Sequence, residues 1–84
     1  MDNINYSKIR SLTAKKIISA LIKDRFVLEK HSRGAHRQYY NTDGRRVTVT
    51  YKHPGDTFPL KTLKSMIEIQ AKWKLNDLKR LKLI

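Results

Sequence analysis

Residues 36–51 read His-Arg-Gln-Tyr-Tyr-Asn-Thr-Asp-Gly-Arg-Arg-Val-Thr-Val-Thr-Tyr. Asn41–Gly44 separates two runs rich in aromatic and β-branched residues, and Asp and Gly tolerate the positive φ that tight turns require. In the second run, Arg45–Tyr51, apolar and polar residues alternate strictly. Val47, Val49 and Tyr51 therefore point to one face of a strand, with Arg46, Thr48 and Thr50 on the other. The stretch predicts a β-hairpin with one apolar face.

A further strand and two helices are predicted around this hairpin. Phe26–Lys30 favours a first strand, joined to the hairpin by a turn at Ser32–Ala35. Thr13 is a suitable N-cap for a helix over Ala14–Asp24, with Leu12 and Ile17 placed to pack across the cap. The helix stripe comprises Ala14, Ile17, Ile18, Leu21 and Ile22.

After the hairpin, His53–Gly55 ends the last strand, and a second helix is predicted over Leu60–Trp73, with Leu63, Met66, Ile67 and Ala71 on its apolar side. Asn76 is predicted to cap a short terminal helix. The predicted fold is a single α+β domain, α-β-β-β-α, in which two helices cover a three-stranded antiparallel sheet. Within residues 1–84 we expect a loosely packed lead-in over 1–12, a core over 13–75 and a terminal helix over 76–84.

Charge is the strongest compositional signal. Nineteen Lys and Arg against seven Asp and Glu give the 84 residues a formal net charge of +12. Such an excess attracts polyanions, RNA above all, although a basic face could also dock on an acidic protein. The chain has no cysteine, so a reducing compartment is compatible. Neither a membrane helix nor a signal peptide is evident, and we expect a soluble cytoplasmic protein.

His36 is the candidate for chemistry. A turn containing Gly34 delivers it to the start of a strand, beside Arg33 and Arg37. Imidazole titrates nearest neutral pH, and guanidinium groups suit an anionic substrate. Gly34 would let a nucleic-acid backbone approach closely. The stretch predicts a site where RNA is cleaved without a metal, with His36 as general base or acid.

Other polar and aromatic residues have weaker claims. Lys61 and Lys64 fall in the first turns of the second helix, where they could hold phosphate or simply face solvent. His31 is explained by exposure, and His53 either shapes a turn or comes near His36 across the sheet. The three histidines match no common zinc pattern. Neither a metal nor another cofactor is therefore expected. Tyr39 and Tyr40 alternate, so one should be buried and the other left exposed for bases.

Several short motifs together resemble the HicA family of toxins. In order they are Leu-Thr-Ala-Lys, Gly-Ala-His-Arg-Gln-Tyr, Asp-Gly-Arg-Arg-Val-Thr-Val, His-Pro-Gly and Thr-Leu-Lys-Ser-Met-Ile, within residues 12–75. The resemblance implies a fold like the double-stranded-RNA-binding domain and an mRNA interferase, an endoribonuclease, neutralised by a HicB antitoxin. It implies that His36 is the catalytic histidine, that Gly34 shapes the turn, and that the first helix and the sheet face meet the antitoxin.

The chain departs from the family pattern in three places. Ala35 stands where Ser is common, and Lys72 falls near a position often occupied by Gly. The segments 1–11 and 76–84 extend beyond the shortest members. Two other functions fit the residues: an RNA-binding module without activity, and an interaction domain for an acidic partner. Neither the RNA preference nor the oligomeric state follows from the sequence.

Overall fold

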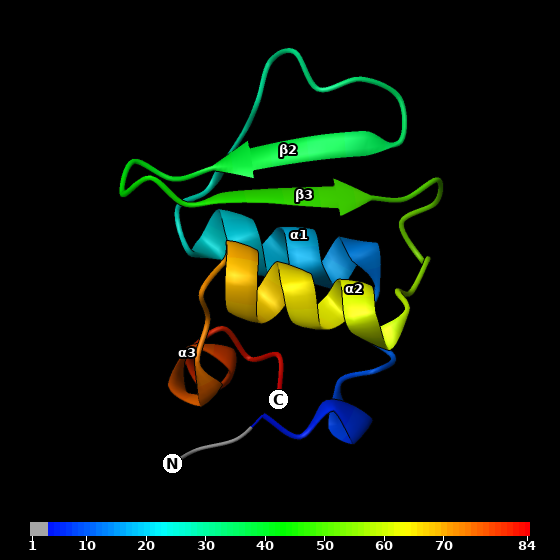
Figure 1. The fold of residues 1–84 in the computed structure, drawn as a ribbon, viewed down its shortest axis with the longest axis vertical. Coiled ribbons are helices and arrows are strands. Elements are labelled where there is room, and N and C mark those ends of the chain that lie inside the picture. Colours follow the sequence, from blue (N-terminus) through cyan, green and yellow to red (C-terminus); the bar gives the residue numbers. More distant parts are fainter. Residues whose placement is uncertain (1–3) are drawn as a thin grey trace.

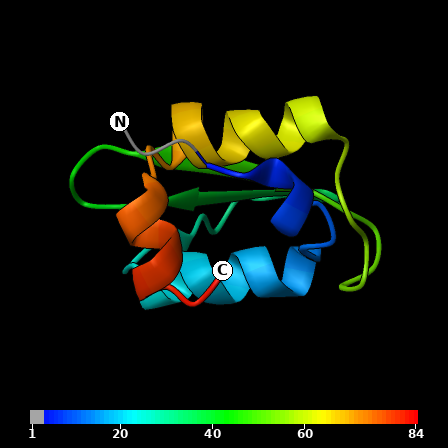
Figure 2. The same ribbon diagram turned by 90° about the horizontal axis from the view of Figure 1, so that it is seen from below.

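The computed structural model describes residues 4–84 and contains a single small sheet with helices on one side. The elements are η1 (Tyr6–Lys8), α1 (Ala14–Lys23), β1 (Val27–Leu28), β2 (His36–Tyr40), β3 (Arg46–Thr50), α2 (Leu60–Lys64), η2 (Ser65–Gln70) and α3 (Leu75–Arg80). The strands form an antiparallel sheet in the order β1-β2-β3. Helices α1 and α2 run alongside β3, and α3 lies near one end of both (Figure 1). Seen from below, β3 appears between the two helices (Figure 2).

This arrangement confirms the predicted α+β fold, like that of the double-stranded-RNA-binding domain, with a short extra helix at the C-terminal end. No helix among residues 4–84 is both long enough and apolar enough to cross a bilayer.

The hairpin of β2 and β3 forms as predicted, except that Arg45 belongs to the turn and β3 covers only Arg46–Thr50. Tyr40 pairs with Arg46 next to the turn, and the ladder continues to His36 opposite Thr50. The Asn41 N–H donates to the Arg45 carbonyl at 2.9 Å, and Gly44 takes a φ of +96°, which favours glycine. Alternation then divides the side chains. Tyr39, Val47 and Val49 are buried toward the helices.

The first strand is shorter than predicted. Only Val27–Leu28 pairs with β2, whereas the sequence indicated a strand over 26–30. Phe26 is buried, but as part of the end of α1: its N–H donates to the Leu21 carbonyl at 2.9 Å. Arg25 has a φ of +69°. These are the features of a Schellman motif, in which an apolar residue after the left-handed position packs back on the helix.

Helix α1 forms where expected, one residue shorter at its C-terminal end. Thr13 is its N-cap and accepts from the Lys16 N–H at 3.3 Å. Ile17, Ala20 and Leu21 of α1 pack into one core cluster with the sheet, η2 and α3, and Ile18 is partly buried against it. The prediction that Ile22 belongs to the apolar stripe is wrong, because its side chain is 60% exposed. Within the part of the chain that the structure describes, the core cluster has sixteen buried residues. Its buried members are Ile9, Leu12, Ile17, Ala20, Leu21, Phe26, Tyr39, Val47, Val49, Leu63, Met66, Ile67, Ala71, Trp73, Leu78 and Leu81.

The expectation of a loosely packed lead-in over 1–12 is wrong for the part that the structure describes; residues 1–3 lie outside it. Ile9 is fully buried and Leu12 nearly so. The Asn5 side chain accepts from the Ser7 N–H at 3.1 Å and caps η1. The segment shows no helical or strand period because a few anchor residues hold it, and periodicity cannot detect isolated anchors.

The second helix is not a uniform α-helix over 60–73. After α2 it widens into the π turn η2, in which the Ala71 N–H reaches the Met66 carbonyl at 2.8 Å. Ser65 and Gln70 are thereby aligned, and the Gln70 side chain donates to Ser65 Oγ at 3.1 Å. The Gln70 amide oxygen accepts from the Thr48 N–H of β3 at 2.8 Å. The Gln70 side chain thus satisfies a backbone N–H of β3, an edge strand whose unpaired N–H groups could otherwise pair with another chain.

The chain leaves η2 through Lys72, whose φ is +56°. The following Trp73 is buried, and α3 begins at Leu75. The prediction that Asn76 caps this helix is wrong. Lys74 occupies the N-cap position, and its backbone N–H donates to the Asp77 carboxylate at 2.8 Å, so Asn76 lies inside the helix.

Replacing Lys72 by Gly should stabilise the fold. A left-handed φ destabilises a residue with a Cβ by about 1–2 kcal/mol, and glycine removes this strain. Glycine also has more conformational freedom in the unfolded chain, which offsets part of the gain in stability. We expect Lys72→Gly to raise the free energy of unfolding by about 0.5–1 kcal/mol, measured by urea denaturation. Lys79→Gly, inside α3, is the matched control and should lower it by about 1 kcal/mol. A loss of stability in both variants would contradict the prediction.

Candidate functional site

The turn before β2 fixes the position of His36. Its backbone N–H donates to the Arg33 carbonyl at 3.1 Å, and the two residues form an isolated β-bridge. Gly34 inside the turn has a φ of +56°, and a Cβ there would meet no atom within 4 Å. Glycine is therefore favoured at this position by backbone conformation, not by space. The Tyr51 N–H donates to the Ala35 carbonyl at 3.0 Å and extends the ladder beyond β3.

His36 lies on the face of the sheet that the helices leave uncovered. Its ladder partner Thr50 is on the same face, and His36 Nδ1 lies 3.1 Å from Thr50 Oγ1. Both side chains are exposed. A histidine acting through Nε2, as a base or as an acid, carries a proton on Nδ1 in either case. The Thr50 hydroxyl oxygen can accept that proton's hydrogen bond and so hold the ring while Nε2 faces solvent.

The uncovered face carries more polar groups than the sequence analysis assigned to the site. His36, Gln38 and Tyr40 come from β2, and Arg46, Thr48 and Thr50 from β3. The Arg46 guanidinium lies 5.8 Å from the centre of the Tyr40 ring and 3.6 Å from the Glu29 carboxylate. An aromatic ring beside a guanidinium is an arrangement on which bases stack.

Arg33 and Arg37 are separated by the sheet. Arg33 is exposed in the turn that holds His36. Arg37 pairs with Val49 and therefore starts from the helix-covered face. Burial raises the pKa of Tyr39, and the charge of Arg37 on the same face opposes that rise. Arg33 is thus joined to His36 through the backbone of the turn, whereas the Arg37 side chain starts from the opposite face of the sheet.

The two lysines of α2 are exposed but not grouped with His36. The Lys64 Nζ lies 5.3 Å from the centre of the Tyr6 ring. The Tyr6 hydroxyl in turn donates to the Glu68 carboxylate, and burial and that carboxylate both raise the pKa of Tyr6. Lys61 lies one turn earlier. The start of α2 is at the same end of the molecule as the start of β2 (Figure 1).

The remaining histidines lie in loops. His31 is exposed between β1 and β2. His53 shapes the turn after β3, where its N–H and that of Lys52 each donate to the Asp56 carboxylate at 3.0 Å. These two bonds lower the pKa of Asp56. Among residues 4–84, no three His, Asp or Glu side chains gather as metal ligands.

Thr50 is the site residue that the sequence analysis missed. The sequence did not place it there: a turn at Asn41–Gly44 with a strand from Arg45 sets residue 36 opposite residue 49, whereas in the structure Arg45 belongs to the turn and Thr50 lies opposite His36. The molecule is therefore a small basic domain in which one face of the sheet is uncovered, polar and carries an exposed histidine.

Comparison with protein families gives the class directly. The family model of the HicA toxin of bacterial toxin–antitoxin pairs matches residues 14–73. The chain belongs to the HicA toxin family. No curated protein and no solved structure matches the chain. Toxins of this family pair with an antitoxin, so the family match supports an antitoxin as a partner of this chain.

Proposed function

We propose that this chain is an mRNA-cleaving toxin, a metal-independent endoribonuclease in which His36 is the catalytic group. The observation that carries the proposal is the contact between His36 Nδ1 and Thr50 Oγ1 at 3.1 Å on an uncovered, polar sheet face. The HicA family match supports a toxin that pairs with an antitoxin, and the antitoxin that we propose is of the HicB kind.

The proposed reaction begins with the ribose 2′-OH attacking the adjacent phosphorus. Nε2 of His36 takes the hydroxyl proton, and the new O–P bond forms as the bond to the 5′ oxygen breaks. A proton, returned by the imidazolium or by water, neutralises the leaving oxygen. The products are a 2′,3′-cyclic phosphate and a 5′-hydroxyl. One positioned acid or base supplies about 10²–10⁴-fold of the acceleration.

Positive charge would stabilise the phosphorane and hold the RNA. Arg33 is the best candidate for this charge, because it lies in the turn that holds His36. Gly34, in the same turn, leaves open space for the RNA backbone. Arg46 and Tyr40 would contact bases farther along the sheet. Arg37, Lys61 and Lys64 would add to the field that attracts RNA, in keeping with the formal charge of +12. An mRNA substrate would place the protein in the cytoplasm.

The direct test is cleavage of a labelled single-stranded RNA by purified protein in EDTA. We expect cutting in EDTA, cyclic-phosphate ends on the products, and no cutting of a 2′-O-methyl version of the same RNA. Binding of both RNAs without cleavage would identify an RNA-binding module instead. Weak, salt-sensitive RNA binding beside tight binding of an acidic protein would favour the interaction domain.

Thr50 should matter to this reaction through His36. Replacement by Val keeps the β-branched shape but removes the hydroxyl, and one hydrogen bond of about 0.5–1.5 kcal/mol is worth about 2–10-fold in rate. We expect Thr50→Val to slow cleavage by about that factor and to change the tautomer ratio of His36 in ¹⁵N NMR spectra. Thr50→Ser should restore both. Unchanged tautomers and rates in Thr50→Val would remove Thr50 from the site.

A further inference from the structure

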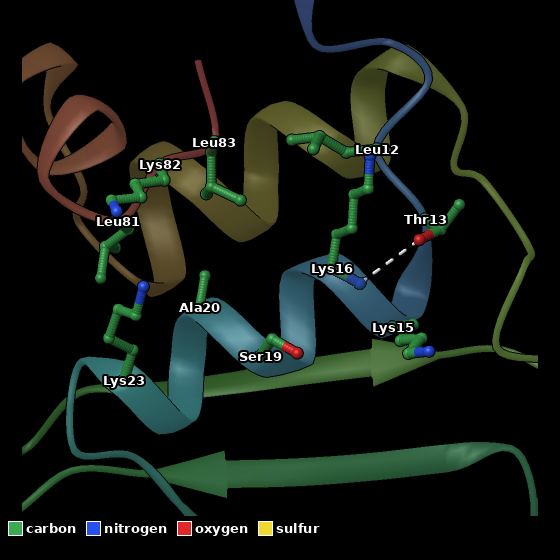
Figure 3. A pocket seen from close by; sticks show the side chains of 10 residues that line it. All are labelled: Leu12, Thr13, Lys15, Lys16, Ser19, Ala20, Lys23, Leu81, Lys82 and Leu83. Carbon is green, nitrogen blue, oxygen red and sulfur yellow. Dashed lines mark hydrogen bonds between the residues drawn. The ribbon is translucent and has the colours of Figure 1, made fainter.

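A groove lined by lysines lies along α1, one of the helices that cover the sheet (Figure 3). It separates α1 from the C-terminal segment and has a volume of about 450 Å³. Its lining comprises Leu12, Thr13, Lys15, Lys16, Ser19, Ala20, Lys23, Leu81, Lys82 and Leu83. In Figure 3, Ala20 on α1 and Leu81 and Leu83 on the C-terminal segment face the same space, with lysines around them.

The floor of the groove is aliphatic and rigid. Leu12, Ala20 and Leu81 are buried members of the core cluster. The far wall is held by a Schellman motif at the end of α3. There the Leu83 N–H donates to the Leu78 carbonyl at 2.8 Å, and Lys82 takes a φ of +59°. The floor and this wall are therefore formed before any ligand arrives.

The rim carries four exposed lysines: Lys15, Lys16, Lys23 and Lys82. No ion pair among residues 4–84 involves any of them. Lys16 and Lys23 stand two turns apart on α1, about 10 Å along its axis. Positive charges gathered around one concave surface raise its potential and attract anions.

The chemistry of the lining favours an acidic peptide over RNA. Single-stranded RNA is held by aromatic or arginine platforms under the bases, and the lining contains neither. An aliphatic floor instead suits a side chain such as leucine, and lysines pair with carboxylates as point charges. Two acidic residues two to four positions apart in an extended segment span about 7–13 Å, which matches the spacing of the rim lysines.

We propose that this groove binds an acidic peptide segment of a partner protein, with an aliphatic side chain on the floor and carboxylates on the rim lysines. The inference does not depend on RNA cleavage, because His36 lies on the other side of the sheet. The wall at Leu81–Leu83 also lies beyond residues 14–73, the part matched by the family model. One wall of the groove is therefore formed by a segment outside the family match, and the other by α1 within it.

The test uses the ¹⁵N-labelled full chain and three synthetic eight-residue peptides. The first is Asp-Glu-Leu-Glu-Glu-Leu-Asp-Glu, the second replaces each acid by its amide, and the third replaces both Leu by Ser. We expect the first peptide to shift the amide signals of Lys16, Ala20 and Leu83, and the other two to bind at least about tenfold more weakly. An eight-residue oligouridine should shift the signals of β2 and β3 instead.

Charge-matched variants show whether the groove itself binds. Lys16→Glu with Lys82→Glu should weaken the first peptide about tenfold, or about 1.4 kcal/mol. Lys8→Glu with Lys30→Glu lowers the net charge equally but lies outside the groove, and should weaken it less than about threefold. The proposal would be overturned if both pairs of variants weakened the first peptide equally, or if that peptide shifted mainly the signals of the sheet. It would also be overturned if the serine peptide bound as tightly as the first, or if oligouridine shifted the signals of the groove.

Discussion

His36→Ala should abolish most RNA cleavage while leaving RNA binding and the fold intact. Loss of a single positioned acid or base lowers the rate by about 10²–10⁴-fold. Arg33 and the uncovered sheet face would still bind the RNA. The His36 side chain is exposed, and its hydrogen bond is to the exposed Thr50 hydroxyl. The free energy of unfolding should therefore change by less than about 0.5 kcal/mol.

The measurement is single-turnover cleavage of a labelled RNA in EDTA, with binding followed separately by fluorescence anisotropy. His31→Ala and His53→Ala are matched controls, because both histidines are exposed and lie outside the strands. They should cleave within about threefold of the parent rate, the effect expected of a lost weak contact. A His36→Ala protein that cuts as fast as the parent would refute the assignment.

Asp24→Asn should cause the largest loss of stability. The Asp24 carboxylate, only 12% exposed, joins three distant parts of the chain at the end of α1. It accepts from Trp73 Nε1 at 2.8 Å, from Arg45 at 3.2 Å and from Arg80 at 3.0 Å. An amide has one acceptor oxygen and no charge, so at least one donor loses its partner. We expect a loss of about 2–4 kcal/mol.

The same residue gives stability a defined pH dependence. Burial raises the pKa of Asp24, but the bonds from Trp73 and Arg80 and the charges of Arg45 and Arg80 outweigh it, so the pKa lies below its usual value of 3.8. A lowered pKa in the folded state means that the contribution is complete above pH 3.8 and is lost as the pH falls through the folded value. The stability gap between parent and variant should close in that window.

Urea denaturation at pH 7 and at several values below pH 4 measures both effects. Asp43→Asn is the control. Its carboxylate also contacts Arg45, at 2.8 Å, but its side chain is 50% exposed, so its loss should cost less than about 1 kcal/mol. A gap between parent and Asp24→Asn that stays constant down to pH 2 would contradict the role given to the carboxylate.

The central hairpin was predictable because local rules govern it. Asp and Gly at the turn fix the loop, and the alternation of Val47 and Val49 fixes which face is buried. The register, and with it the pairing of His36 with Thr50, depends on Arg45 joining the turn, which the sequence did not indicate. Thr13 and the apolar stripe after it determined α1. Each of these signals lies within a few residues of the structure that it specifies.

Tertiary packing decided the remaining features. Ile9 is buried although no period surrounds it, and Phe26 ends a helix instead of starting a strand. The widened turn at η2 forms where Gln70 meets the edge of β3. Arg33 and Arg37 are only four residues apart in sequence, but Arg37 starts from the helix-covered face of the sheet and Arg33 lies in the turn before β2.

The sequence by itself therefore determined the central hairpin, the face of it that is buried, and the place of His36 at the start of β2, within the HicA family fold. Only the tertiary structure brought Asp24 to Trp73 and Arg80, and set Leu81–Leu83 beside α1 to form the lysine-lined groove. The physical reason is distance along the chain. Turn and strand preferences act between near neighbours, whereas ion pairs and grooves join residues that only the folded core brings together.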